Sequence, residues 1–232
     1  MPDPDGRQKV VALVPAAGRG ERLGADEPKA LVGVGGEPLV RRAVRGLLAS
    51  GVVDFVVVAA SSELLGNFAV CLAEFGERCQ IVPGGAERGS SVRNALAAVE
   101  PGSVEFVLVH DAARAFTPVG VIRAVVDGLA AGADAVVPGL PVTDTVKEVD
   151  DAGTVTGTVA RESLRLIQTP QGFTESVLRR AYELRTGAVT DDSRLAELLG
   201  VEVRTVLGHP HAMKITTPFD LLVAESILAA GP

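Results

Sequence analysis

Short apolar runs alternate along the chain with longer segments in which apolar residues recur every three or four positions. The short runs are rich in Val and predict buried strands, whereas the longer segments predict helices with one apolar face. The predicted strands are 9–15, 53–60, 79–85, 105–114 and 133–142. The predicted helices between them are 38–50, 63–75, 90–99 and 118–132. Repeated strand–helix units of this kind predict an α/β fold, a Rossmann-like three-layer sandwich with a mainly parallel sheet.

The alternation stops at about residues 141–166, which are polar and rich in Thr and Val. A turn signal at Asp151–Gly153 divides this segment, so we expect a two-stranded hairpin. Such an arm has too few apolar residues for a core of its own and is expected to pack on another surface. Beyond it the pattern predicts helix, helix, strand and helix over 174–185, 191–200, 201–208 and 218–230. We expect a single domain over 1–232 with a protruding β-arm at 141–166.

The composition and charge of the chain argue against several classes of function. Apolar residues make up 47% of the 232 residues but aromatic residues only 3%, so Val, Leu and Ala must fill the core. A net charge of −7 without a dense basic run argues against nucleic-acid binding. The sequence has neither an apolar run of membrane-spanning length nor a signal-peptide pattern, so we expect a cytoplasmic protein with no membrane partner. The spacings of the two Cys and three His residues match no metal-binding motif.

The stretch "VPAAGRGERLGADEPKAL", residues 14–31, places a glycine loop directly after a predicted strand. It does not fit the dinucleotide fingerprint, because the third glycine comes one residue late and no acidic residue follows at the expected distance. The P-loop pattern is absent too, since no Gly–Lys–Ser/Thr occurs in the chain. The loop fits a nucleotidyltransferase better: small residues let backbone N–H groups approach a triphosphate, and Arg19, Arg22 and Lys29 supply cations around its α-phosphorus.

Segments later in the chain indicate which kind of nucleotidyltransferase the sequence resembles. In order, they are "GGAERGSSVRNAL", "VLVHDAAR", "PVTDTVK", "TVARESL", "QTPQGF", "TDD" and "MKITTPFDL". Together with the glycine loop, this ordered set resembles the 2-C-methyl-D-erythritol 4-phosphate cytidylyltransferases, a family of sugar- and alditol-phosphate nucleotidyltransferases. The resemblance runs from about Val10 to Ala229 and implies the nucleotide-diphospho-sugar transferase type of fold.

The resemblance also implies roles for individual residues. The residues that match the triphosphate loop are Ala16, Ala17, Gly18, Arg19 and Gly20. Arg22 and Lys29 match the pair that stabilises the transition state. The segment near cytosine and ribose is matched by Gly84, Gly85, Arg88 and Ser91, with backbone groups around Gly85 distinguishing cytosine from uracil. Asp111 matches a magnesium ligand. The acceptor contacts are matched by Arg114, Thr145, Arg161, Thr169 and Lys214, with Thr145 and Arg161 in the arm.

Several of these residues also have an ordinary structural interpretation. Asp111 could simply pair with Arg114, and Arg161 could be a solvated charge on an exposed hairpin. Lys214 lies in an apolar stretch, where an unpaired ammonium is costly, which favours a phosphate partner. Thr190–Asp192 has the composition of a helix cap, and the residues around Pro210 that of a turn. Ala86 departs from the family pattern, in which many members have Asp or Ser.

The implied reaction joins CTP and 2-C-methyl-D-erythritol 4-phosphate and releases pyrophosphate, as a step of the non-mevalonate route to isoprenoid precursors. The implied cofactor is Mg²⁺ or another divalent cation. The implied assembly is a homodimer in which the arm of one subunit brings Arg161 to the site of the other. A ribitol 5-phosphate cytidylyltransferase, a noncatalytic nucleotide-binding regulator and a redox enzyme are the alternatives.

Overall fold

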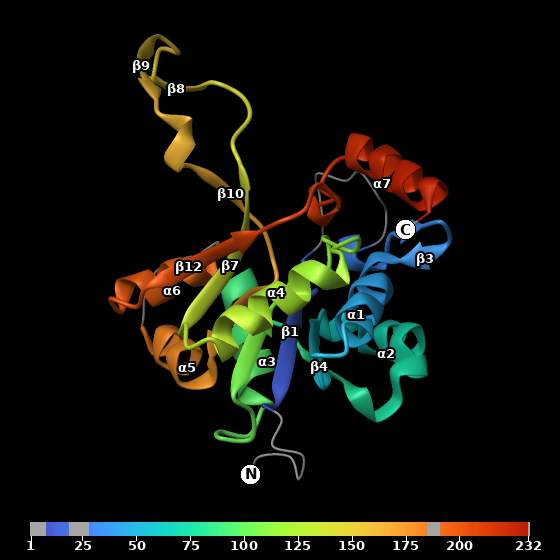
Figure 1. The fold of residues 1–232 in the computed structure, drawn as a ribbon. Helices are drawn as coiled ribbons and strands as arrows, with labels where there is room; N and C mark the ends of the chain where they lie inside the picture. The colour runs from blue at the N-terminus through green and yellow to red at the C-terminus, as the bar shows by residue number, and fades with distance from the viewer. Residues whose placement is uncertain (1–7, 19–27, 185–190, 232) are drawn as a thin grey trace.

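An eight-stranded sheet forms the centre of the molecule (Figure 1). The structure is a computed structural model, and it describes residues 8–18, 28–184 and 191–231. The strands of the sheet are β1 (Val10–Pro15), β4 (Phe55–Ala60), β5 (Cys79–Pro83), β6 (Phe106–Val109), β7 (Ala135–Pro141), β10 (Arg165–Ile167), β11 (Gln171–Thr174) and β12 (Val203–Leu207). Their order is β10-β7-β11-β6-β1-β4-β5, and β12 also pairs with β7. The run β6-β1-β4-β5 is parallel throughout, which agrees with the mainly parallel sheet predicted.

Helices cover both faces of this sheet (Figure 1). They are α1 (Leu39–Ala49), α2 (Leu65–Leu72), α3 (Arg88–Ala97), α4 (Val119–Ala130), α5 (Glu175–Glu183), α6 (Asp192–Leu198) and α7 (Pro218–Ala230). Alternate residues of β1 enter different cores, as the period of two in a strand requires. Ala12 belongs to a buried apolar cluster that includes residues of α1, α2 and α4, whereas Leu13 belongs to one that includes residues of α3, α5 and α6. The three-layer sandwich is therefore present.

The sheet contains two strands that the hydrophobic pattern did not predict, β10 and β11. β11 lies between β6 and β7 and runs antiparallel to both. Three of its four residues are buried, but it begins with Gln171 and Gly172, which carry no strand-like apolar alternation. A strand this short is specified by its two neighbours rather than by its own side chains.

Two predicted helices differ in detail. The helix expected over 63–75 is divided into a 3-10 turn, α2 and a second 3-10 segment (Ala73–Arg78), in which Gly76 has a φ of 52°. The helix expected from Ser90 begins at Arg88 instead, and its N-cap is Glu87. Ser90 lies inside the first turn, where its hydroxyl accepts the backbone N–H of Glu87 at 3.0 Å. The serine therefore completes a capping box rather than starting the helix.

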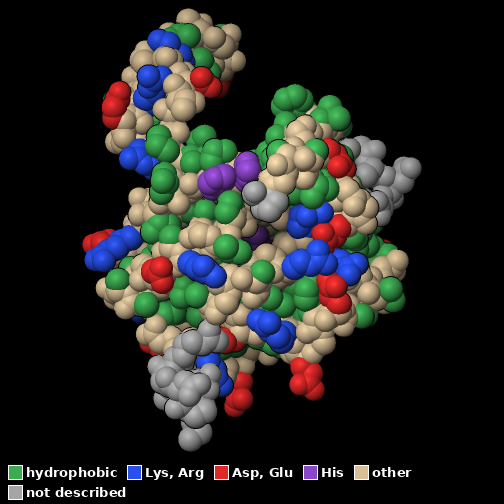
Figure 2. Space-filling view, turned by 45° about the vertical axis from the view of Figure 1, so that its right-hand side comes forward, with side chains coloured by type: hydrophobic (Ala, Val, Ile, Leu, Met, Phe, Trp, Pro, Cys, Tyr) green, Lys and Arg blue, Asp and Glu red, His purple; other side chains and the backbone are tan. Residues whose placement is uncertain are grey.

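The predicted arm contains an antiparallel hairpin of β8 (Val146–Val149) and β9 (Val155–Val159). Its turn is closed by Asp150, whose carboxylate accepts the N–H groups of Ala152 and Thr154. Figures 1 and 2 show the arm projecting from the body of the molecule. Most of its side chains are exposed, as expected for a segment without a core of its own. In the described part of the chain, no helix is long and apolar enough to span a membrane.

Candidate functional site

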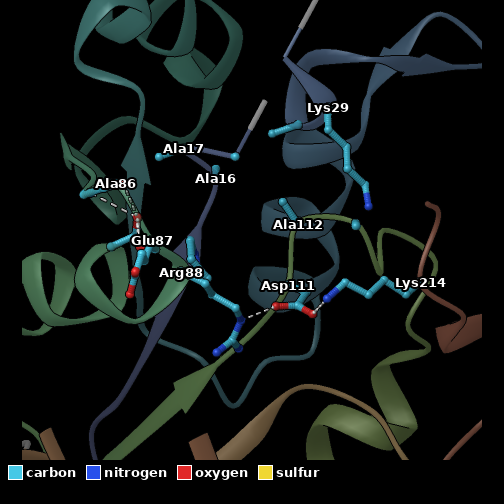
Figure 3. A pocket seen from close by; sticks show the side chains of 15 residues that line it. Ala16, Ala17, Lys29, Ala86, Glu87, Arg88, Asp111, Ala112 and Lys214 are labelled. Atoms are coloured by element: carbon cyan, nitrogen blue, oxygen red, sulfur yellow. Dashed lines mark hydrogen bonds and ion pairs between the residues drawn. The ribbon is translucent and has the colours of Figure 1, made fainter. Parts of the chain in front are cut away.

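A cavity of about 320 Å³ opens beyond the carboxyl ends of β1 and β6, where ligands bind in open α/β sheets. Its walls come from four segments that are separate in the sequence and from one residue near the C-terminus. The lining residues are Pro15, Ala16, Ala17, Gly18, Lys29, Ala30, Gly85, Ala86, Glu87, Arg88, Ser91, Asp111, Ala112, Ala113 and Lys214. Figure 3 shows Arg88 entering from one side and Lys29 and Lys214 from the other.

Small residues line one wall because two loops approach each other closely there. Backbone hydrogen bonds from Ala16 to Ala59 (2.8 Å) and from Gly84 to Ala60 (2.7 Å) hold both loops against the end of β4. A Cβ atom on Gly84 would lie 2.6 Å from the Cβ of Ala17, so a side chain there would separate the loops. The backbone is thereby accessible on this wall, as a phosphate-binding loop requires.

The start of α3 forms the next part of the wall. The hydroxyl of Ser91, a buried residue, accepts the N–H of Gly85 at 3.1 Å and donates to the carbonyl of Glu87. This side chain fixes the loop before the helix from within. Gly85, Ala86 and Glu87 then face the cavity in front of the helix N-terminus. Ala86 has no polar side chain, so polar contacts at this position are left to the backbone.

Asp111 is the acidic centre of the cavity and directly follows β6. Its Oδ1 accepts Nε of Arg88 at 3.0 Å, and its Oδ2 pairs with Nζ of Lys214 at 2.7 Å. Burial alone would raise the pKa of Asp111, but the charges and hydrogen bonds of Arg88 and Lys214 outweigh burial and hold it well below its usual range. The carboxylate is therefore ionised at every physiological pH.

Two buried residues support Asp111 from behind. The backbone N–H of Asp111 donates to Oγ1 of Thr169 at 3.0 Å, and the same oxygen lies 3.0 Å from Nδ1 of His110. Thr169 is 4% exposed and is not among the cavity-lining residues. In this structure its hydroxyl therefore holds the loop that carries Asp111.

The structure brings nine of the predicted site residues to this cavity: Ala16, Ala17, Gly18, Lys29, Gly85, Arg88, Ser91, Asp111 and Lys214. Gly84 lies directly beside them. Thr145 and Arg161 lie on the exposed arm, where Arg161 donates to the carbonyl of Thr143. Arg19, Gly20 and Arg22 are outside the described residues.

Arg114 is not among the residues that line the cavity. Its Nη1 donates to the carbonyl of Ala212 at 2.7 Å, and its Nη2 donates to that of Ile167 at 3.3 Å. Its Nε is 4.0 Å from Asp111, farther than Arg88 or Lys214. The main partners of Asp111 are thus those two cations, and Arg114 ties together backbone segments behind the cavity.

The cap expected at Thr190–Asp192 is not made by the acidic side chains. Asp191 occupies the N-cap position of α6, but its carboxylate bonds the side chains of Gln171 and Ser193 instead of the helix backbone. Asp192 reaches the site: its Oδ2 accepts Nη2 of Arg88 at 2.7 Å. The sequence contained a signal for the burial of Asp192 that the interpretation as a cap missed. Asp192 lies three and four positions before the buried Leu195 and Ala196, so it shares a helix face with them.

The predicted turn around Pro210 is confirmed. A 3-10 turn (Pro210–Ala212) follows His209, whose ring Nδ1 accepts the N–H of His211 at 3.0 Å. Earlier in the chain, a turn within Gly33–Gly36 joins the short hairpin of β2 (Gly33–Val34) and β3 (Glu37–Pro38), with φ values of 59° at Gly35 and 75° at Gly36.

The residues present fit a hard divalent cation that is shared with a bound phosphate. Among residues 8–18, 28–184 and 191–231, no group of three or more His, Cys, Asp or Glu side chains could hold a metal by itself. Mg²⁺ commonly takes one or two protein carboxylates and completes its shell with phosphate oxygens and water. Asp111 supplies one ionised carboxylate at the cavity wall, which suits that arrangement.

Comparison with known proteins shows similarity over almost the whole chain. The sequence model of the 2-C-methyl-D-erythritol 4-phosphate cytidylyltransferase family matches residues 10–230. The enzyme of that name from Saccharopolyspora erythraea is 58% identical over 222 residues, covering 95% of this chain and 99% of its own. The solved structure of the enzyme from Thermus thermophilus has a TM-score of 0.77 at 36% identity, covering 96% of this chain and 99% of its own. The structure of 4-diphosphocytidyl-2C-methyl-D-erythritol synthase from Anaerococcus prevotii gives 0.84 at 27% identity, with the same two coverages.

Proposed function

The chain belongs to the 2-C-methyl-D-erythritol 4-phosphate cytidylyltransferase family, and we propose that the cavity around Asp111 is where its reaction takes place. The enzyme joins CTP and 2-C-methyl-D-erythritol 4-phosphate in the synthesis of isoprenoid precursors. One observation carries the assignment of the site. Lys29, Arg88, Asp111 and Lys214 converge on one cavity that the loop Ala16–Gly18 also lines.

In the proposed reaction, a phosphate oxygen of the acceptor forms a bond to the α-phosphorus of CTP. The bond from that phosphorus to the bridging oxygen of the β-phosphate breaks, and pyrophosphate leaves with the electron pair. The acceptor is mostly dianionic at neutral pH, because the second pKa of a phosphomonoester is about 6. No general base is needed, and the enzyme acts by positioning its substrates and stabilising charge.

We assign some of the cationic side chains to the binding of CTP and the others to the binding of the acceptor. Lys29 and Arg22 would contact the triphosphate of CTP, where charge develops on the nonbridging oxygens and on the leaving group. The backbone of Gly84 and Gly85 would hold the cytidine. Lys214 is 42% exposed on its side chain and, with Arg161 and Thr145 of the arm, would bind the phosphate of the acceptor. Thr169 and Arg114 would act from behind the cavity by fixing the segments that carry Asp111 and Lys214.

We also propose Mg²⁺ as the cofactor, with Asp111 as its protein ligand. When bound, the ion would neutralise charge on the triphosphate and on the leaving pyrophosphate. Lys214 now occupies Oδ2 of Asp111, so this ammonium is the group that must yield a position on the carboxylate.

The arm supports a homodimer as the working unit. It projects from the body, and Leu166 at its base is 58% exposed, as are Leu207 (72%) and Phe219 (71%) in the body. A second copy of the chain would cover apolar surface of this kind and bring its Arg161 to the cavity. A cytoplasmic location stays a prediction from the sequence.

The test is magnesium-dependent release of pyrophosphate from CTP with three acceptor conditions: methylerythritol 4-phosphate, ribitol 5-phosphate and none. Release only with methylerythritol 4-phosphate is expected. Release only with ribitol 5-phosphate would contradict the assignment of methylerythritol 4-phosphate as the acceptor. No pyrophosphate release with any acceptor, from a protein that still binds CTP, would indicate a noncatalytic regulator.

A further inference from the structure

The proposed reaction leaves unexplained the second ion pair of Arg88, which joins the same guanidinium to Asp192. Nε of the guanidinium donates to Asp111 at 3.0 Å, and Nη2 donates to Asp192 at 2.7 Å. Asp192 is 1% exposed and lies on α6, outside the set of cavity-lining residues. A carboxylate buried to this extent is destabilising unless it is paired and hydrogen-bonded, so its position is coupled to that of Arg88.

Asp192 is itself held by a third residue. The hydroxyl of Tyr182 on α5 donates to its Oδ1, so both oxygens of Asp192 are engaged. Burial, together with the charge of Asp192, raises the pKa of Tyr182, and the hydroxyl stays protonated and able to donate. A continuous chain of contacts thus runs from Tyr182 through Asp192 and Arg88 to Asp111.

We propose that Asp192 is a positioning residue for the active site, acting on Asp111 through Arg88. By holding Nη2, it would turn the guanidinium so that only Nε meets Oδ1 of Asp111. Figure 3 shows this contact, with Lys214 on the other oxygen of the carboxylate. This inference rests on the proposed role of Asp111 in the reaction.

The reason is the geometry of the guanidinium. Arg forms its strongest pairs when two N–H groups meet both oxygens of one carboxylate or phosphate. Without Asp192, Arg88 would be free to rotate into such a bidentate pair with Asp111 or with an entering phosphate. Either pair would occupy oxygens that the reaction needs, and the loss would appear in CTP binding and in its magnesium dependence.

The experiment compares Asp192→Asn with Asp191→Asn, a matched change one residue away. Asp191 bonds Gln171 and Ser193 and has no contact with Arg88 among the described hydrogen bonds and ion pairs. Both variants are made in the natural protein and in the Arg88→Lys variant. Lys keeps the positive charge but lacks the planar guanidinium that can contact two carboxylates at once. The readouts are kcat/KM for CTP, and CTP affinity by calorimetry with and without magnesium.

We expect Asp192→Asn to lower kcat/KM about 10- to 100-fold, the range for residues that orient a ligand group. The gain in CTP affinity on adding magnesium should shrink in parallel, whereas Asp191→Asn should change either readout by no more than about twofold. In the Arg88→Lys background, Asp192→Asn should add little, because the residue through which it acts is already altered.

An unchanged kcat/KM in Asp192→Asn would overturn the inference, as would an equal fall in both backgrounds, which indicates a merely structural ion pair. Should Asp192→Asn not fold, Tyr182→Phe makes the same comparison, since it removes one of the two contacts that hold Asp192. The Asp111→Asn variant distinguishes a failure of the proposed site from a failure of the positioning role of Asp192. If that variant keeps full activity, the proposed site is wrong; if it is inactive while Asp192→Asn behaves as the natural protein, only the inference fails.

Discussion

At the scale of single residues, His110 shows how strongly burial controls chemistry in this site. Its side chain is 1% exposed and lies against Thr169. Burial is the main reason that the pKa of His110 is lowered to about 4, and the charge of Arg114 adds to the effect while Asp111 opposes it. The imidazole is therefore neutral at pH 7 and supports the loop as a hydrogen-bonding group rather than as a charge.

Acid should consequently destabilise the protein through His110. The unfolded chain takes up this proton near pH 6.5, but the folded chain does so only near pH 4. Between these values the unfolded state binds more protons, so the free energy of unfolding falls as pH falls. From pH 7 to pH 5, we expect the natural protein to lose about 2 kcal/mol more than His110→Gln, measured by urea unfolding. Equal losses in both proteins would contradict this assignment.

The sequence could identify residues whose chemistry is visible in a short motif. Lys29, Asp111 and Lys214 were predicted, and they lie together at the cavity. Asp192 was interpreted as part of a helix cap, because capping depends on neighbouring residues that a sequence displays. Its real partners, Arg88 and Tyr182, are 104 and 10 positions away. Contacts that only the fold creates could not be derived from local spacing.

At the scale of elements, β11 sits at the centre of the sheet and depends on close packing. Gly172 pairs with Leu108 of β6 and with Val136 of β7. A Cβ atom at Gly172 would lie 2.5 Å from Val125 and 2.9 Å from Leu129, both on α4. The absence of a side chain at this position therefore allows α4 to lie directly on the strand.

Gly172→Ala should lower the free energy of unfolding by about 1–3 kcal/mol, the usual cost of overpacking a core. Gly120→Ala is the matched control, because Gly120 lies in the first turn of α4 and a Cβ atom added there would have no neighbouring atom within 4 Å. It should stabilise the helix by about 0.4–1 kcal/mol. Denaturant unfolding of both variants measures the difference, and a neutral Gly172→Ala would show that α4 shifts freely.

The same element shows why parts of the fold were hidden from the sequence. Strands such as β4 are apolar along their length and were predicted directly. In β11 a Gln and a Gly stand where apolar residues would be expected, and burial comes from the strands on either side. Hydrophobic periodicity finds an element whose own residues form the core, and it misses one that fills a gap between others.

At the scale of the whole molecule, the proposed homodimer would divide the proposed site between two copies of the chain. The cavity contains Lys29, whereas Arg161 is exposed on the arm. If the arm serves the partner's cavity, a variant lacking Lys29 and a variant lacking Arg161 are defective in different halves of the site. A dimer with one copy of each has one intact site and one doubly defective site.

Mixing Lys29→Ala with Arg161→Ala should therefore restore activity. With equal amounts and free exchange of subunits, half of the dimers are mixed, and about one quarter of the natural activity returns. Pyrophosphate release after overnight exchange measures it, and each variant alone is the control. No recovery, in a mixture shown by mass spectrometry to contain heterodimers, would place Arg161 at the cavity of its own chain.

The central place of β11 also affects how the protein is made. β6 and β7 each pair with β11 and not with each other, so both present an unpaired edge until it arrives. The strand ends at residue 174 of 232, so the ribosome has added three quarters of the chain before the gap can close. Open strand edges recruit other chains. We therefore expect the facing edges of β6 and β7 to need protection from other chains at least until residue 174 has been translated.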